Sequence, residues 1–220
     1  MTSPAFRLII IGLVFSGCLC IFFHWRNRIR KKLLDCFHQL NQSYDGEIKS
    51  NSLWLGQYPE FVIRNGQALV SLRPTSAQGG FTSEPSDFRR EPAHTVITTV
   101  INDPSYEIRC DVRTKGILSK LINTRDMENL GNDYPAMVEH FHVETNNASF
   151  IREFLSPDIQ QNLLDLRHTE VSFFIGSPFG PMTLISVRAK GIITELEKLE
   201  KMINIQLKCI AVLRKMGVQI

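Results

Sequence analysis

The feature that most constrains the fold of this 220-residue chain is an apolar run near its N-terminus. Residues 8–23 read LIIIGLVFSGCLCIFF, without a charge or a strongly polar group. A helix needs about 20 mainly apolar residues to cross a bilayer, with a lower limit near 17. The segment from Pro4 to Trp25 reaches that length, and Trp25 lies where an interfacial aromatic side chain is expected. The sequence therefore predicts an N-terminal transmembrane anchor over residues 1–25.

A cluster of basic residues follows the apolar run directly. Its members are Arg26, Arg28, Arg30, Lys31 and Lys32. Only Arg7 and the α-amino group stand on the other side of the run. Basic residues collect on the cytoplasmic side of membrane helices. We therefore expect a single-pass protein of the inner (plasma) membrane, with residues 26–220 in the cytoplasm. The bilayer is then one partner, and its anionic headgroups would contact the basic cluster.

Two other interpretations of the apolar run stay open. A cleaved signal peptide carries its charges before the apolar core, whereas here the charges follow it. A lipoprotein anchor is the second alternative, because residues 15–18 (FSGC) resemble a lipobox that would place the lipid on Cys18. Phe15 replaces the usual Leu of that motif, and an apolar stretch follows where a polar tether is usual. In a retained helix, Cys18 and Cys20 are simply small apolar residues.

The charge distribution separates the N-terminal segment from the rest of the chain. The formal net charge is +3, from 25 basic and 22 acidic residues. Six of the basic residues and none of the acidic ones lie in residues 1–32, which leaves 19 basic and 22 acidic residues, a net charge of −3, for residues 33–220. A nucleic-acid-binding protein would carry a basic patch on its body. We therefore expect no nucleic-acid partner.

The cysteines and the absence of known motifs exclude several classes of site. Five cysteines lie at wide spacings without a CxxC pair, which argues against a disulfide framework or a structural zinc site. The chain has no P-loop, GxGxxG, GxSxG, HExxH or kinase-like sequence. We therefore expect no cofactor and name no catalytic residue, and whether the protein is an enzyme stays open.

Helical periodicity continues beyond the apolar run. Ile29, Leu33, Phe37 and Leu40 form a narrow apolar stripe, which predicts a basic juxtamembrane helix over residues 26–40. A polar stretch from residue 41 to residue 52 is typical of a loop. Residues 41–220 are then expected to form one soluble domain.

Most of the first half of this domain has strand patterning. Asn65-Gly66 is a strong hairpin signal, since both residues tolerate the positive φ of the turn. In residues 106–113, apolar and charged residues alternate, which places Cys110 and Val112 on the apolar face. The predicted strands are 61–64, 67–73, 94–101, 106–113, 139–145, 171–175 and 182–187. Residues 74–93, rich in Pro, Gly and Ser, are predicted to form a long flexible loop that contacts partners.

Helices dominate the second half of the domain. We expect helices over 117–122, from Ala148, and from Ser156-Pro157, where Ser is an N-cap and Pro the first helical residue. A long C-terminal helix runs from Ile192 to about Lys215, and Gly217 ends it. Strands and helices do not alternate as they would in a parallel sheet. The order predicts an α+β fold with a mainly antiparallel sheet and a long C-terminal helix.

One pair of histidines could carry chemistry. His140 and His142 lie two residues apart on a predicted strand, so both imidazoles would share a face and could bind one metal ion. Two ligands do not complete a site, and the sequence names no third. The alternative is two exposed histidines opposite a buried Phe141.

The stretch from Leu130 to Leu166 resembles a pattern found in bacterial single-pass membrane proteins of unknown function. In that pattern an Asp-rich turn precedes a Phe-x-Val strand, matched here by Asp133 and residues 141–143 (FHV). An Asp usually follows a Phe before the strand, and residues 137–139 (MVE) depart from this. The resemblance implies a membrane anchor with an α+β domain, and it implies no activity and no site residues.

The sequence as a whole favours a binding or interaction module at the membrane. Its partner would be an unknown protein, or lipid headgroups at the basic cluster. The alternatives are a membrane-tethered enzyme and a lipoprotein anchored at Cys18. An enzyme should show a cleft with convergent polar groups, whereas a binding module should show an exposed apolar patch or sheet edge.

Overall fold

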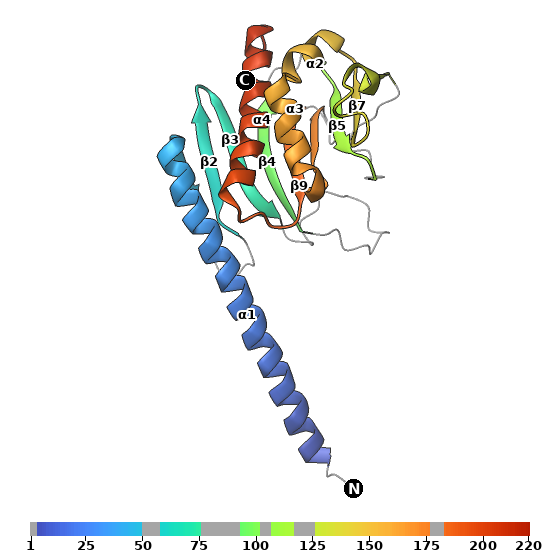
Figure 1. Ribbon diagram of the computed structural model, residues 1–220. Helices are drawn as coiled ribbons and strands as arrows, with labels where there is room; N and C mark the ends of the chain where they lie inside the picture. Colours follow the sequence, from blue (N-terminus) through green and yellow to red (C-terminus); the bar gives the residue numbers. More distant parts are fainter. Residues whose placement is uncertain (1–3, 50–57, 76–92, 102–106, 117–125, 177–182) are drawn as a thin grey trace.

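One antiparallel sheet organises the domain (Figure 1). The computed structural model describes residues 4–49, 58–75, 93–101, 107–116, 126–176 and 183–220, and only the backbone of residues 4–10. The strands are β1 (Gly46–Lys49), β2 (Glu60–Asn65), β3 (Ala68–Thr75), β4 (His94–Ile101), β5 (Cys110–Thr114), β6 (Glu128–Asn129), β7 (Phe141–Thr145), β8 (Ser172–Gly176) and β9 (Thr183–Lys190). Within the described residues they pair in the order β1-β2-β3-β4-β9-β8-β5-β7-β6.

Helices cover one face of this sheet. The α-helices are α1 (Pro4–Ser43), α2 (Ala148–Phe154), α3 (Pro157–Leu166) and α4 (Leu196–Lys215), with short 3-10 helices η2 (Gly131–Asp133) and η3 (Arg167–Thr169). In Figure 1, α4 and α3 lie across the middle of the sheet and the end of α1 runs beside β2. The rest of α1 projects away from the domain as a single helix.

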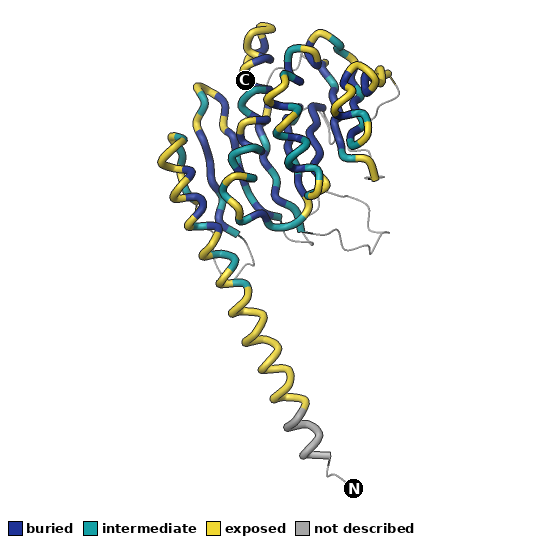
Figure 2. The backbone as a smooth tube through the Cα atoms, viewed as in Figure 1, coloured by how far each residue is buried: buried dark blue, intermediate teal, exposed yellow. Residues whose placement is uncertain are grey.

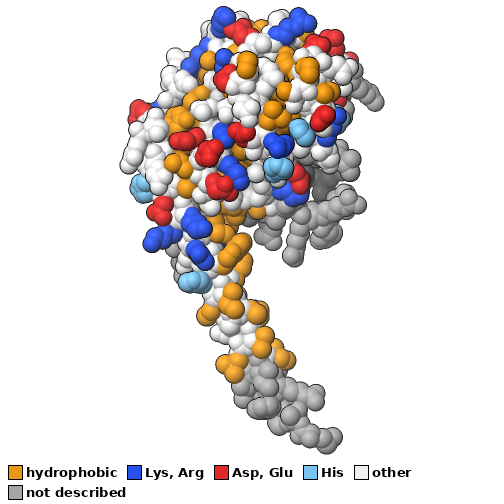
Figure 3. Space-filling view, viewed as in Figure 1, with side chains coloured by type: hydrophobic (Ala, Val, Ile, Leu, Met, Phe, Trp, Pro, Cys, Tyr) orange, Lys and Arg blue, Asp and Glu red, His pale blue; other side chains and the backbone are white. Residues whose placement is uncertain are grey.

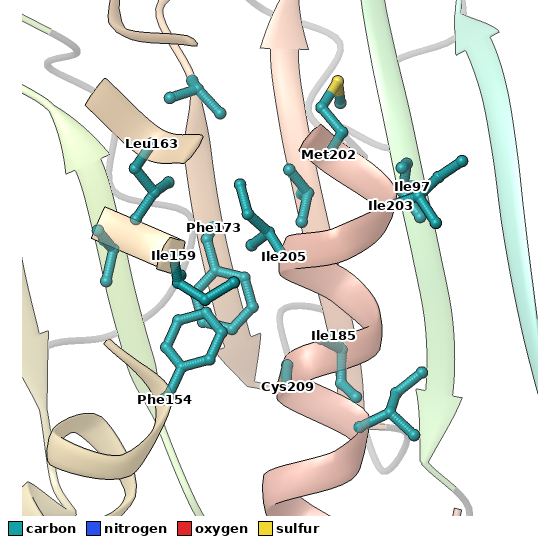
Figure 4. Close-up of a cluster of buried hydrophobic side chains, with 14 of the residues drawn as sticks. Ile97, Phe154, Ile159, Leu163, Phe173, Ile185, Met202, Ile203, Ile205 and Cys209 are labelled. Atoms are coloured by element: carbon teal, nitrogen blue, oxygen red, sulfur yellow. The ribbon is translucent and has the colours of Figure 1, made fainter. Parts of the chain in front are cut away.

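The core lies between the sheet and these helices (Figure 4). Ile97, Phe173 and Ile185 point from the sheet towards α4, which contributes Ile203 and Ile205. All five side chains are completely buried. Since side chains alternate between the two faces of a strand, the residues next to those from the sheet point to the opposite face. That alternation gives the sheet a second face, on which no helix of the described residues lies.

The C-terminal part of α1 belongs to this core. Leu33, Phe37 and Leu40 have no exposed surface, which confirms the apolar stripe predicted for residues 26–40. The Phe37 ring stacks on Phe61 of β2 with the centroids 5.6 Å apart. Cys36 Sγ donates a weak hydrogen bond to the Thr194 carbonyl at 3.1 Å. The helix that begins in the apolar run therefore ends as a packed element of the domain.

The structure confirms the α+β class, the antiparallel sheet and the C-terminal helix. A hairpin joins β2 and β3 as predicted, but its turn lies one residue later, because Asn65 pairs with Ala68 and the two turn residues are Gly66, at a φ of 62°, and Gln67. The helix start predicted at Ser156-Pro157 is also correct, because Ser156 is the N-cap of α3 and Pro157 is its first residue. Gly217, at a φ of 88°, follows the end of α4 as predicted.

Four sequence interpretations are corrected. The predicted loop over residues 41–52 contains β1, which pairs with β2 at the sheet edge, and the two-residue strand β6 was not predicted. Both strands are short, and Ile48 is the one large apolar residue in them, so they have no apolar alternation to reveal them. Residues 74 and 75 of the predicted loop belong to β3, and α4 begins at Leu196 rather than at residue 192. Residues 76–92 and the helix predicted over 117–122 lie outside the described residues.

The described residues do not confirm the predicted membrane span. Within the part of the chain that the structure describes, no helix combines the length and apolar character needed to cross a membrane. The described side chains of α1 begin at Ile11, so residues 4–10 of the predicted span lie outside them.

Packing of α1 predicts a large effect of one substitution. Phe37→Ala should lower the free energy of unfolding by about 3–5 kcal/mol, because it leaves a cavity beside Phe61. Denaturant titration of the full chain in detergent, followed by circular dichroism, measures this change. Gln39→Ala, at an exposed position of the same helix, should change it by less than about 0.5 kcal/mol. Equal midpoints for the two variants would contradict the packing.

Candidate functional site

The projecting half of α1 presents apolar side chains to the surroundings. Every side chain from Ile11 to Trp25 is exposed (Figure 2). The large ones are Ile11, Leu13, Val14, Phe15, Leu19, Ile21, Phe22, Phe23 and Trp25, between 41% and 71% exposed. The exposure extends to every residue of this segment rather than to one stripe of it. This segment, residues 11–25, is called the apolar stalk below.

The predicted basic cluster lies between the apolar stalk and the domain. Figure 3 shows Lys and Arg side chains where the stalk meets the body. Arg28, Lys31 and Lys32 are exposed, and Arg26 and Arg30 are half-buried. The Arg26 guanidinium carbon lies 5.8 Å from the ring centre of Tyr58, which is a cation–π distance. Burial raises the pKa of Tyr58, and the charge of Arg26 acts in the opposite direction.

The other predicted site residues do not come together in the structure. His142 is half-buried in β7, and His140 lies just before that strand. Among the described residues, no group of three or more His, Cys, Asp or Glu side chains could hold a metal ion. The histidine pair therefore gains no third ligand there, and metal binding stays a prediction. Cys18 is an exposed free thiol in the apolar stalk, and its lipidation also stays a prediction.

The other face of the sheet, on which no helix of the described residues lies, carries mostly polar side chains that sequence reasoning did not single out. The strand registers place two cross-strand rows on this face. One row comprises Glu144, Asp111, Phe174, Ser186, Thr98, Ser71 and Val62. The other comprises His142, Arg113, Ser172, Arg188, Val96 and Arg73. This set of residues is called the polar face below.

A buried charge cluster lies at one end of the polar face. The side chains of Asp111 and Arg113 are only 2% and 7% exposed, although their alternation in β5 predicts a solvent-facing position. Arg113 Nη1 donates to Asp111 Oδ2, and Glu144 Oε2 of β7 lies 3.7 Å from the same nitrogen. Buried ions need such partners, because desolvation of an uncompensated charge is costly. The alternation signal was correct, and only the pairing of β5 with β7 and β8 could reveal the burial.

Arginines also occupy the middle of the polar face. The register aligns Arg73 of β3 and Arg188 of β9 on either side of Val96 in β4. Arg188 Nη2 donates to Nδ1 of His94 at 3.0 Å. The Nε atoms of Arg73 and Arg113 are buried, and no acceptor in the described residues reaches them. Nothing in the local sequence signals this row, because its members come from three distant segments.

The buried cysteines do not add a reactive site. Cys110 of β5 and Cys209 of α4 have no exposed surface. Burial raises the pKa of both thiols well above the ordinary value. Since the thiolate is the nucleophile, these two thiols are held in the unreactive form. The structure thus agrees with the interpretation of Cys110 as a packed residue.

Comparison with known proteins adds little beyond the fold. No known protein family and no curated protein matches the chain. In structure it is similar to the mycobacterial trehalose monomycolate transport factor A, TtfA, with a TM-score of 0.48 and 12% identity, covering 84% of this chain and 94% of that one. A likeness of this degree does not transfer a function. The chain's own residues therefore carry the functional argument.

We expect the buried ion pair of Asp111 and Arg113 to contribute more to stability than an exposed ion pair does. Asp111→Ala should lower the free energy of unfolding by about 3 kcal/mol or more, because it leaves Arg113 buried beside a more distant carboxylate. Urea titration of the full chain in detergent measures the loss. The matched control is Glu170→Ala, which removes a half-exposed pair with Lys190 and should cost less than about 1 kcal/mol. A loss for Asp111→Ala no larger than the control's would show that the cluster is unimportant for stability.

Proposed function

We propose that this protein is a membrane-anchored binding module, with the apolar stalk inserted in a bilayer and the α+β domain held at its surface. The observation that carries the proposal is the unbroken exposed apolar surface of α1 from Ile11 to Trp25. In the sequence, the apolar run also includes residues 8–10, which are Leu-Ile-Ile. Together these residues supply the length that a spanning helix requires.

The distribution of the apolar side chains favours lipid as the cover. A second protein helix would bury one stripe of the stalk, whereas lipid chains surround a helix completely. Burial of one large apolar side chain contributes roughly 1.5–3 kcal/mol. With nine such side chains exposed on the stalk, transfer from water to lipid is favourable by on the order of 10 kcal/mol or more. That gain supports stable insertion.

The basic cluster supports one orientation. Five basic residues follow the stalk and only Arg7 precedes it, so the positive-inside rule puts the domain in the cytoplasm, at the inner membrane. Exposed Arg28, Lys31 and Lys32 would then lie at the level of anionic headgroups. Trp25, at the boundary between stalk and cluster, is suited to the membrane interface.

The continuity of α1 would fix the domain in relation to the bilayer. Helical rise places Leu33, the first buried residue of α1, about 12 Å beyond Trp25 along the helix axis. Since Leu33 and Phe37 are packed in the core, the domain cannot swing freely as it would on a flexible linker. A ligand or protein bound to the domain would be held close to the membrane surface.

Binding is favoured over catalysis by the state of the buried carboxylates. Asp111 and Glu144 lie beside Arg113 and neutralise its charge. A general acid or base needs a carboxyl group that reaches the proton of a substrate. The partner of the module is proposed to be an unidentified protein or a headgroup-bearing lipid.

The native cysteines provide a direct test of insertion. Cys18 and Cys20 lie in the apolar stalk, and position 39 lies on an exposed turn of the same helix beyond the basic cluster. The full chain with Gln39→Cys is reconstituted in vesicles and treated with a membrane-impermeant thiol reagent. Mass spectrometry then reads labelling at each cysteine. Insertion predicts rapid labelling at position 39 and none at Cys18 or Cys20 until detergent and denaturant are added.

Two results would count against the proposal. Labelling of Cys18 and Cys20 in vesicles at the rate of position 39 would show that the stalk lies in water. A lipid-sized mass on Cys18 after denaturation would replace the transmembrane anchor with a lipoprotein anchor.

A further inference from the structure

Three apolar side chains lie together on the same side of the sheet as the polar face. Val100 of β4 pairs directly with Leu184 of β9. The pairing of Ser71 with Thr98, continued by two residues along both strands, brings Leu69 of β3 next to Val100. Because side chains two residues apart share a face, all three lie on the side that carries Ser71 and Thr98. Leu69, Val100 and Leu184 are called the apolar patch below.

The apolar patch is open to the surroundings. Leu69 is 57% exposed and Val100 is 41% exposed, while Leu184 is half-buried. Beyond the apolar stalk, the described large apolar side chains that are exposed are these two and Met216. Neighbouring apolar side chains that stay exposed together, with polar residues around them, are typical of an interaction surface. The domain thus has a place for a partner that is separate from its core.

The charge around the apolar patch is positive. The outer faces of β2, β3, β4 and β9 carry four basic side chains and one acidic side chain, which are Arg64, Arg73, Arg188, Lys190 and Glu60. Lys190 pairs with Glu170, and Glu60 accepts a hydrogen bond from Ser71. Among the described residues, no carboxylate forms a salt bridge with Arg64 or Arg73. The complement of this surface is therefore an acidic one.

The apolar patch lies at the end of the domain away from the apolar stalk (Figure 1). α4 begins just after Thr194, whose carbonyl accepts a hydrogen bond from Cys36 of α1. The last turn of α4 reaches the hairpin between β2 and β3, where Arg214 Nη1 donates to Asn65 Oδ1 at 2.8 Å. The 20 residues of α4 span about 30 Å, and Leu69 follows the hairpin. A bilayer that holds the stalk is out of reach, which favours a protein over a lipid as the partner.

The relief of this surface suits a helix. Four residues along β3 separate Leu69 from Arg73, a distance of about 13 Å, which corresponds to about nine residues of an α-helix. The side chains between the two positions are the short ones of Ser71 and Thr98. A helix that lies along β3 and β4 can therefore place apolar side chains on the apolar patch and carboxylates beside Arg64 and Arg73.

We propose that the apolar patch, together with Arg64 and Arg73, binds an acidic amphipathic helix of a partner protein. Apolar side chains of that helix cover Leu69 and Val100, as in other complexes in which a helix docks by its apolar face. Its carboxylates accept from the two guanidiniums, which fixes the direction of the helix. This inference rests on the proposed function, because it names the class of partner that the binding module takes.

Synthetic peptides of about four helical turns are the probes. The first has Leu on one face and Glu on the others, the second has Lys in place of Glu, and the third has the composition of the first in a scrambled order. The full chain in phosphatidylcholine nanodiscs is titrated against each fluorescent peptide, and anisotropy is corrected with empty nanodiscs. We expect saturable binding of the Glu peptide and at least tenfold weaker binding of the other two.

Substitutions on the sheet test the contacts. Leu69→Thr, Arg64→Glu and Arg73→Gln should each weaken binding of the Glu peptide at least tenfold. Arg64→Glu, at an exposed position, should also strengthen binding of the Lys peptide, which a loss of folding would not do. The matched control is Arg152→Glu, which makes the same charge change at an exposed position of α2 and should leave binding unchanged. Thermal unfolding reports whether each variant is folded.

Three results would overturn the proposal. They are no saturable binding of the Glu peptide, equal binding of the Glu and Lys peptides, and unchanged binding in the folded Leu69→Thr variant. Equal weakening by Arg152→Glu and Arg64→Glu would count against it in the same way. Labelling of Cys18 and Cys20 in the same nanodiscs tests the membrane anchor independently, so failure of the helix site is distinguished from failure of the anchor.

Discussion

The packing of Phe37 against Phe61 joins the two parts of this molecule. It places the last turns of α1 in the same core as the sheet and α4, with Leu33 and Leu40 completely buried beside it. From Ile11 to Trp25, the same helix carries exposed apolar side chains. Because the helix is unbroken, whatever holds the apolar stalk also holds the domain. This contact therefore holds the N-terminal hydrophobic segment in a fixed position relative to the domain.

The two faces of the sheet carry different kinds of side chain. The helix-covered face is apolar and supplies the stability of the domain, with Phe154 and Phe173 stacked at 4.4 Å as one of its contacts. The polar face carries a buried ion pair in β5 and half-buried arginines in β3 and β9. Antiparallel sheets allow this division because successive side chains point in opposite directions. Recognition of a ligand on the polar face need not disturb the core.

Local signals made much of the fold predictable. The hairpin at Gly66 and the start of α3 at Ser156-Pro157 depend on the conformational preferences of neighbouring residues, so the sequence is sufficient for both. The stripe containing Leu33 and Phe37 was predictable for the same reason. The edge strand β1 was missed, because a strand of four residues with one large apolar side chain, Ile48, has no distinctive pattern.

The polar face was not predictable from the sequence, since it arises from pairing between distant segments. Arg73 and Arg188 become neighbours only through β4, which pairs with both β3 and β9. The burial of Asp111 depends similarly on Glu144 from β7 and Phe174 from β8. By contrast, His140 and His142 are close in sequence and were noticed for that reason, yet the described residues supply no third metal ligand. Closeness in the sequence therefore did not predict which side chains lie together in the structure.

Amide hydrogen exchange of the full chain in lipid nanodiscs tests the central claim most directly. That claim is that one continuous helix is covered by lipid at one end and by the protein core at the other. It predicts slow exchange from Ile11 to Trp25 and from Leu33 to Leu40, with the second segment losing protection only when the sheet unfolds. Rapid exchange from Ile11 to Trp25, while Leu33 to Leu40 stay protected, would contradict it.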